Sequence, residues 1–330
     1  MAKKKRLSLG QFFYWLRYRI GEICLRGFVW ILPRTARPLL RSLTVVSARI
    51  SFIVLRKYRK RMEENLTVAM GRENLTQEEK SALVVKVWQN FAYGFLEAIL
   101  AMYASEKEIL SMVRIEEEEN LKKAFTKGKG VIALSAHLGN FMMIGIGLAA
   151  AGYPFNVVVK HPRDRRFARL FDDYRARVGI KTISSRPRRE ATRQILKALR
   201  KNEVVLLVAD EFKSGGVEVE FLGRRVSAQR GPVTLAMRTG APLLPIFATR
   251  DEKDHLTLHI GSELDLTQTG NVQEDVDANV ALFTHQLERM VRRYPEQWSW
   301  LGFHRNGRKP RSKMRTYRTA PRNPSAPLSS

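Results

Sequence analysis

The sequence of 330 residues contains a single cysteine, Cys24. One cysteine excludes an internal disulfide and a cysteine-based zinc site, which fits a reducing compartment. The six histidines form no metal-ligand pattern, because His255 and His259 lie in a predicted strand without a matching set of carboxylates. We therefore expect no bound metal and no cofactor.

Two catalytic signatures are also missing. The only glycine-rich candidate, "GKG" at 128–130, lacks the spacing of a Walker or dinucleotide loop. No Gly-x-Ser-x-Gly sequence is present, so a serine nucleophile on a strand-to-helix elbow is not expected.

Acidic residues are scarce at the amino terminus. Glu22 is the only acid among the first 62 residues, and over the whole chain 58 Lys and Arg outnumber 32 Asp and Glu, a net charge of +26. Such an excess indicates a polyanionic partner, either nucleic acid or an anionic membrane surface. A nucleic-acid reader would place aromatic residues among its basic residues on a recognisable motif, and no such motif occurs. We expect no nucleic-acid partner.

Long apolar runs are absent too. Residues 1–60 mix bulky apolar and basic residues, and Trp15, Arg19, Glu22 and Arg26 share one face of a predicted helix. No uninterrupted run reaches the roughly 18 residues that indicate a spanning helix. We interpret 1–60 as a basic amphipathic segment whose helices lie in or dip into an anionic membrane surface. The alternative is a buried amphipathic pair with a basic outer face. The broken apolar region argues against a signal peptide.

From residue 61 onward the pattern predicts one large domain. Short apolar runs such as "GVIALSA", "FNVVVK" and "EVVLLVAD" alternate with amphipathic helical stretches up to residue 306. This alternation predicts an α/β fold with a mostly parallel or mixed sheet covered by helices on both faces, behind an N-terminal membrane-associated helical segment. Residues 307–330 are basic and rich in Pro and Ser, and are predicted to be a disordered tail.

Reactive side chains follow two of the predicted strands. His137 comes after "VIALSA" and Asp210 after "EVVLLVA". Because the carboxyl ends of parallel strands meet at one crevice, both side chains are candidates for a site there. The Gly139-Asn140 turn is expected to let the backbone approach a substrate, and a neutral imidazole at this place can take the proton of an attacking hydroxyl. A structural histidine at a strand end is the alternative.

The order of several stretches resembles a known family, the bacterial lipid A biosynthesis (lauroyl/myristoyl, late) acyltransferases within the lysophospholipid acyltransferase group. The resemblance covers residues 10–306. Its pieces are "RYRKRMEENLTVAM", "SAHLGNFMM", "VVKHPRDRRFARLFDDYR", "VADEFKSGGVEVEFLG", "GPVTLAMRTGAPLLPIFATR" and "YPEQWSWLGFHR".

This resemblance implies an acyltransferase of lipid A (lipopolysaccharide) or other lipid biosynthesis. It would act at the cytoplasmic face of the bacterial cell inner membrane. The acyl donor implied is acyl carrier protein and the acceptor is a hydroxyl of a membrane lipid, such as a lipid A precursor or a lysophospholipid. His137 matches the family's catalytic base, and Asp210 matches the aspartate that follows a later strand.

The chain departs from the family pattern at two places. The family has His, four residues, then Asp or Glu, but Met142 occupies that acid position here. Where the family usually has Tyr-Arg-Pro, this chain has Lys160-His161-Pro162, so Lys160 and His161 are the candidates for substrate binding.

Three interpretations of the missing acid stay open. Another acid orients His137, with Asp210 the best candidate and Glu211, Asp172 and Asp173 behind it. Alternatively, His137 works unassisted at a low rate. The third is a catalytically impaired family member, a pseudoenzyme that binds lipid or acyl chains.

Overall fold

The molecule is built around a mixed seven-stranded sheet with the strand order β1-β9-β8-β2-β5-β3-β4. The computed structural model describes residues 9–35, 37–71, 75–162, 164–212 and 215–301, so the predicted tail 307–330 lies outside the described residues. Neighbouring strands pair in parallel except β8 with β9. Their bounds are β1 (Val113–Glu116), β2 (Val131–Ser135), β3 (Phe155–Val159), β4 (Ile180–Ser184), β5 (Val204–Val208), β8 (Leu243–Arg250) and β9 (Leu256–Ile260). The predicted α/β class with a mostly parallel, mixed sheet is confirmed.

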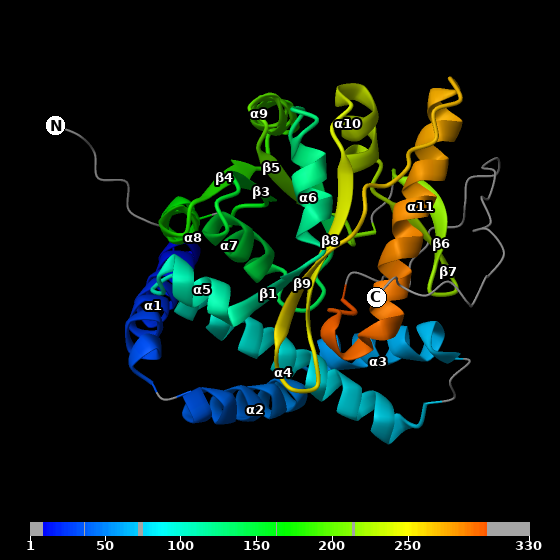
Figure 1. Ribbon diagram of the computed structural model, residues 1–330. Helices are drawn as coiled ribbons and strands as arrows, with labels where there is room; N and C mark the ends of the chain where they lie inside the picture. The colour runs from blue at the N-terminus through cyan, green and yellow to red at the C-terminus, as the bar shows by residue number, and fades with distance from the viewer. Residues whose placement is uncertain (1–8, 36, 72–74, 163, 213–214, 302–330) are drawn as a thin grey trace.

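Side chains of β2 alternate between two separate apolar cores. Ile132 and Leu134 join one core and Val131 and Ala133 the other, as expected for a strand buried on both faces. The first core holds residues of α9 (Arg188–Arg200), α10 (Gly231–Thr239) and α11 (Val272–Arg293); the second holds residues of α5 (Glu106–Met112), α6 (Glu118–Phe125) and α7 (Met142–Ala150). Helices therefore cover both faces of the sheet (Figure 1).

The described chain begins with the helices α1 (Leu9–Ile31), α2 (Arg37–Val54) and α3 (Arg56–Ala69). The predicted boundary after residue 60 falls inside α3, whose Met62 and Leu66 belong to the first core. On α1, Glu22 bridges Arg19 and Arg26, so these three residues share one face, as their spacing predicts. A short 3₁₀ turn, Leu32–Arg34, follows α1.

Helix α2 has apolar residues on two sides. Leu40, Thr44 and Ala48 are buried at four-residue spacing, and α2 packs against the long helix α4 (Gln77–Ala101), as Figure 1 shows. On the outer side an apolar stripe is 47% to 61% exposed: Leu39, Leu43, Val46, Ile50 and Ile53. No helix within the described ranges is both long and apolar enough to cross a bilayer.

Several elements were not predicted from the sequence: α5, α6, the edge strands β1 and β4, and the hairpin of β6 (Val217–Phe221) and β7 (Arg224–Ala228). β1 (VRIE) alternates for only four residues, and β4 (IKTIS) is interrupted by two adjacent polar residues, so neither gives a clear strand pattern. In the hairpin, Leu222 and Gly223 both have positive φ, as a two-residue turn requires.

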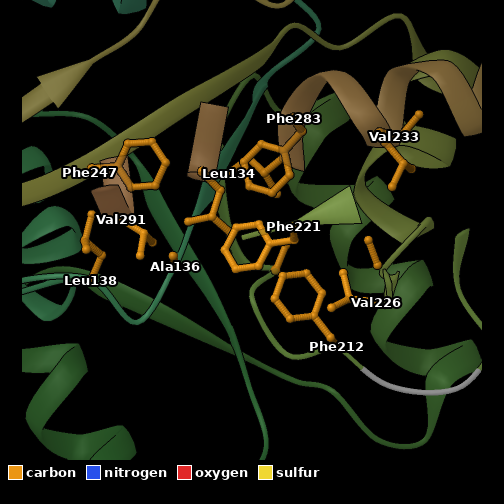
Figure 2. Packing of buried hydrophobic residues seen from close by; sticks show 14 of the residues in the cluster. Leu134, Ala136, Leu138, Phe212, Phe221, Val226, Val233, Phe247, Phe283 and Val291 are labelled. Atoms are coloured by element: carbon orange, nitrogen blue, oxygen red, sulfur yellow. The ribbon is translucent and has the colours of Figure 1, made fainter. Parts of the chain in front are cut away.

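The hairpin brings aromatic packing beneath the end of β2. The Phe221 ring lies 4.7 Å from the Phe212 ring and 5.5 Å from the Trp298 ring, centroid to centroid. Figure 2 shows Phe221 and Phe212 in one apolar cluster with Leu134, Ala136 and Leu138, the residues that flank the candidate histidine. This core holds the end of β2 rigidly.

Helix α8 (Arg165–Arg177) and a last 3₁₀ turn complete the described fold. α8 follows β3, and its Leu170 and Tyr174 form a small apolar cluster with Leu32, Leu40, Leu96 and Ile99. A last 3₁₀ turn, Pro295–Gln297, leads the chain back to the end of β2 through an isolated bridge between Leu138 and Trp298.

Candidate functional site

His137 and Asp210 lie side by side at the carboxyl edge of the sheet. Ser135 of β2 is paired with Val208 of β5, so the residues two positions further on are at the same level. His137 donates its backbone N–H to Asp210 Oδ2 at 2.9 Å, and its ring Nδ1 lies 2.8 Å from Asp210 Oδ1. The parallel register therefore brings together the two side chains that the sequence singled out.

Trp298 completes the surroundings of this carboxylate. Its indole Nε1 donates to Asp210 Oδ2 at 2.9 Å, and the Asp210 side chain is 2% exposed. Burial by itself raises the pKa of the Asp210 carboxyl, but hydrogen bonds from the His137 ring, Trp298 and the His137 amide outweigh it and hold that pKa below its ordinary value. The carboxylate is thus ionised at neutral pH.

An ionised carboxylate only accepts hydrogen bonds, so in the neutral ring the proton resides on Nδ1. Nε2 then carries the lone pair that a general base needs. The His137 side chain is 35% exposed, against 2% for Asp210, so the ring reaches from a buried anion toward the surface. Phe141 contacts the ring edge at 5.0 Å between centroids.

The turn after His137 is tightly joined to the protein. Gly139 has a φ of +56°, and a Cβ there would lie 1.9 Å from the Ala248 carbonyl oxygen, so only glycine fits. Gly139 N–H donates to the Gln297 carbonyl and Asn140 N–H to the Ala248 carbonyl. Both amides already serve protein acceptors, and substrate contacts at Gly139 or Asn140 stay a prediction.

A buried ion pair supports the same turn from the other side. Asn140 Nδ2 donates to Glu97 Oε2 at 2.9 Å, and Arg250 at the end of β8 donates to the same oxygen. Burial raises the pKa of Glu97 even though Arg250 and Asn140 oppose it. Gln297 exchanges two hydrogen bonds with the Arg250 backbone, at 2.9 and 2.7 Å. Together, Glu97, Arg250 and Gln297 hold the turn that carries His137.

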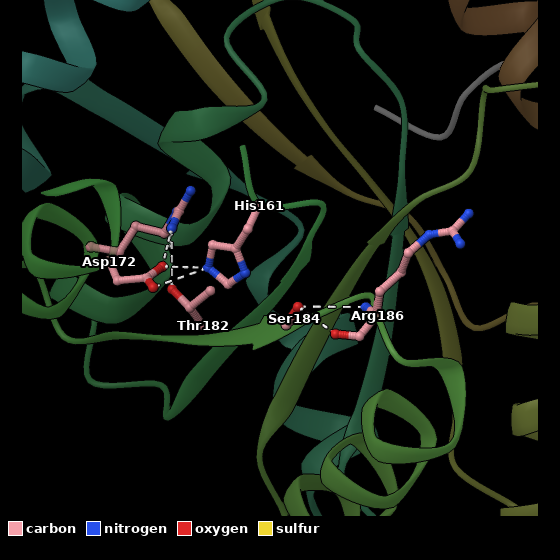
Figure 3. A network of polar contacts seen from close by, with 6 residues as sticks. His161, Asp172, Thr182, Ser184 and Arg186 are labelled. Atoms are coloured by element: carbon pink, nitrogen blue, oxygen red, sulfur yellow. Dashed lines mark hydrogen bonds and ion pairs between the residues drawn. The ribbon is translucent and has the colours of Figure 1, made fainter. Parts of the chain in front are cut away.

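His161 forms a different pair. Its Nε2 lies 3.0 Å from both oxygens of Asp172, and Arg175 donates to Asp172 Oδ1 at 2.8 Å and to Thr182 Oγ1 at 3.2 Å. Figure 3 shows the His161 ring facing Asp172 across this network. Lys160 beside it is exposed. A substrate contact of Lys160 and His161 stays a prediction.

The contacts that the structure describes for the other acids considered from the sequence do not include His137. Asp172 binds His161 and Arg175, while Asp173 and Glu211 are exposed. Met142 is the first residue of α7, and its half-buried side chain packs against the second core. Asp210 alone among the acids considered contacts the ring.

Sequence reasoning did not identify Trp298, Glu97, Arg250 or Gln297 as parts of this site. One signal was available: Glu97 is the single acid in the apolar helical run "FLEAILA". Trp298 and Gln297 lie in "YPEQWSWLGFHR", a stretch of the family resemblance that by itself indicates no role for them. Within the described residues, no three His, Cys, Asp or Glu side chains come together in a way that would hold a metal.

The chain matches a family described as bacterial lipid A biosynthesis acyltransferase over residues 4–306. A phosphatidylinositol mannoside acyltransferase of Mycolicibacterium smegmatis is 28% identical over 188 residues, which cover 56% of this chain and 59% of that protein. The enzyme of that name from Mycobacterium tuberculosis CDC 1551 / Oshkosh is 33% identical over 129 residues, covering 38% and 41%.

A lipid A biosynthesis palmitoleoyltransferase of Escherichia coli K12 is 20% identical over 280 residues, covering 83% of this chain and 87% of that protein. The chain thus spans less than two thirds of the mycobacterial relatives but most of the Escherichia coli one.

Proposed function

The chain belongs to the bacterial lipid A biosynthesis acyltransferase family, and from this premise we propose that it moves a fatty acyl chain from acyl carrier protein to a hydroxyl of a membrane lipid. One observation carries the proposal: the ring of His137 lies 2.8 Å from the buried carboxylate of Asp210 at the carboxyl edge of the sheet. A lipid A precursor and a lysophospholipid are the acceptors we consider.

In the proposed reaction, His137 Nε2 takes the proton of the acceptor hydroxyl as its oxygen attacks the thioester carbonyl carbon. The resulting tetrahedral intermediate collapses, the carbon–sulfur bond breaks, and the imidazolium returns its proton to the departing thiolate. The products are an ester of the lipid and the free thiol of the carrier. No cofactor is needed, because the thioester supplies the activated acyl group.

In this proposal Asp210 has the role that the family assigns to the acid five residues after the histidine. It keeps the ring proton on Nδ1 and stabilises the imidazolium that forms as the hydroxyl loses its proton. The contact supports the first of the three interpretations of Met142, in which an acid from elsewhere replaces the missing one. The unassisted base and the impaired pseudoenzyme are the alternatives that the experiments below test.

Mass spectrometry of total lipids tests the function in the cell. A strain lacking the protein is expected to lose one acyl chain from one lipid species, which also identifies the acceptor. The wild-type chain is expected to restore that species, and a His137→Ala chain is not. Unchanged lipids in the deletion strain, together with no transfer by the purified protein, would leave the pseudoenzyme as the better account.

We also propose that α1 and α2 bind the cytoplasmic face of the inner membrane. The exposed apolar stripe of α2 supports this, together with exposed residues of α1 such as Ile23 and Trp30 and the basic residues around them.

Deleting residues 1–60 would also uncover α4, so substitutions on the stripe test the membrane proposal more cleanly. Leu43→Gln/Ile50→Gln should move the protein from the membrane to the soluble fraction. A matched control, Leu110→Gln/Val272→Gln, removes two exposed apolar residues outside these helices and should leave the protein on the membrane. Equal behaviour of the two double variants would contradict the proposal.

A further inference from the structure

Helices α8 and α9 both begin with a pair of exposed arginines. Arg165 and Arg166 form the first turn of α8, and Arg188 and Arg189 that of α9. The positive end of the helix dipole disfavours cations at this place, so helix stability does not explain these pairs. As exposed cations, these arginines are suited to bind a partner that carries negative charge.

Two more exposed cations lie next to these pairs. Lys160 directly follows β3, and Arg186 lies between β4 and α9. We call this set of six, Lys160, Arg165, Arg166, Arg186, Arg188 and Arg189, the arginine edge. Among the residues that the structure describes, none forms an ion pair with these six, and Glu190, the acid in the first turn of α9, is bonded to Arg193 and Gln194.

The arginine edge adjoins the edge of the sheet where His137 lies. The strand order β2-β5-β3-β4 puts the carboxyl ends of β3 and β4 two and three strands away from the end of β2. At about 4.8 Å per strand these ends are about 10 and 14 Å from the strand that carries His137. A macromolecule bound there is close enough to present an acyl group on a flexible arm.

The character of the surface distinguishes a soluble partner from a membrane. Surfaces that enter a membrane carry apolar side chains among the basic ones, as α1 and α2 do. Among the described residues between 111 and 271, none is a large apolar residue with an exposed side chain. Figure 1 places α9 far from α2, whereas α8 lies against α1, where the Phe167 and Tyr18 rings are 6.0 Å apart. The α9 side of the arginine edge, with Arg186, Arg188 and Arg189, is therefore basic without an apolar component.

We infer that the arginine edge is the docking surface for the acidic acyl carrier protein that delivers the acyl thioester. The inference rests on the proposed function and adds to it the place where the donor binds. Complementary charge steers such an encounter and fixes the orientation of the carrier, so that its thioester arm extends along the edge of the sheet toward His137.

The test uses the full-length protein with two donors of the same acyl chain, acyl carrier protein and acyl-coenzyme A. For Arg188→Glu/Arg189→Glu we expect KM for the carrier-bound donor to rise at least about tenfold. We expect kcat with either donor and KM for the coenzyme A donor to be unchanged. The melting temperature should stay the same or rise, because the new acids suit the helix dipole.

A matched control reverses two charges elsewhere. Lys123 and Arg238 are exposed in the last turns of α6 and α10, which lead to the amino ends of β2 and β8. Lys123→Glu/Arg238→Glu changes the net charge equally and should leave KM for both donors unchanged. Its melting temperature should fall, since the dipole favours cations at a helix C-terminus.

Three results would overturn the inference. The first is an unchanged KM for the carrier donor. The second is an equal rise in KM for both donors, which assigns the edge to the phosphates they share. The third is a control variant whose KM values change like those of the test variant. Weaker flotation with anionic vesicles, at unchanged KM, would assign the edge to the membrane.

Direct binding separates this inference from the proposed function. If the wild-type protein transfers from neither donor, the proposed function fails, and titration calorimetry with unacylated carrier protein still tests the docking. Tight binding at low salt that weakens at least about tenfold in Arg188→Glu/Arg189→Glu supports the arginine edge. Equal Kd values for the wild type and the variant overturn it.

Discussion

Two of the molecule's histidine–aspartate pairs follow parallel strands of one sheet, His137–Asp210 and His161–Asp172, and their surroundings differ. The Asp172 carboxylate is 36% exposed and also binds the guanidinium of Arg175. The Asp210 carboxylate is 2% exposed, and besides the His137 ring it accepts hydrogen bonds from the neutral indole of Trp298 and from the backbone amide of His137.

This difference distinguishes an exposed pair from a buried one suited to proton transfer. The guanidinium of Arg175, a permanent cation, already balances the charge of Asp172. A buried carboxylate with neutral donors has no permanent counter-ion, and an imidazolium on His137 supplies one when the ring takes a proton. The same two residue types thus have different chemical capacity because of their neighbours.

The largest expected effect comes from the histidines themselves. His137→Ala should abolish acyl transfer by the purified protein, because it removes the proposed base, and should cost about 1–3 kcal/mol of stability, because the buried Asp210 loses a hydrogen bond. His161→Ala should keep kcat within about threefold and cost about 1 kcal/mol of stability through lost hydrogen bonds, and a rise in KM would report the predicted substrate contact. Comparable activity of wild type and a folded His137→Ala protein would remove His137 from the mechanism.

The aspartates sharpen the same comparison. Asp210→Asn should lower kcat by about 10⁴, since the amide no longer holds the ring proton on Nδ1 or stabilises the imidazolium. Asp172→Asn should change kcat by no more than about threefold. Steady-state kinetics of both variants measure these changes in kcat. Equal losses of kcat in the two variants would show that the different surroundings of Asp210 and Asp172 do not affect catalysis.

The support of the His137 turn should matter next. Glu97→Ala leaves Arg250 without its buried partner and should cost about 3–5 kcal/mol of unfolding free energy. It should also lower kcat about 10- to 100-fold by loosening the turn. Glu203→Ala is the control, because Glu203 is another buried acid, bonded to Asn156 and Lys181 just before β5. An equal fall in kcat in Glu203→Ala would indicate that loss of any buried acid loosens the protein, and not the His137 turn in particular.

A pH series tests the state of Asp210. Since the pKa of its carboxyl is depressed in the folded protein, the stabilisation is present above the unfolded value of 3.8 and is lost as pH falls through the lower folded value. Asp210→Asn should therefore be about 1–3 kcal/mol less stable than wild type near pH 7. The gap should narrow below pH 3.8, as measured by denaturant unfolding. A constant gap would contradict an ionised Asp210.

The smallest expected effect is at the family's usual acid position. Met142→Glu should change kcat by no more than about threefold, because Asp210 already contacts Nδ1. A carboxylate at the first residue of α7 suits the helix dipole but loses apolar packing, so the stability change should also be small. A large gain in rate would indicate that Asp210 orients the ring poorly.

Much of this architecture was readable from the sequence. The apolar runs that became β2, β3 and β5, and the helical stretches predicted between them, are confirmed. The placing of His137 and Asp210 at strand ends followed from the same runs. These features depend on periodicity among neighbours along the chain, which a single sequence displays directly.

Other features depend on which distant segments pack together. The pairing of Ser135 with Val208 puts Asp210 beside the ring, and Trp298 arrives from 88 residues beyond that aspartate. The different surroundings of His137 and His161 likewise depend on the residues packed around Asp210 and Asp172. Strand register and long-range hydrogen bonds arise from packing of the whole core, so local sequence alone leaves them open, and only the tertiary structure determined which acid serves His137.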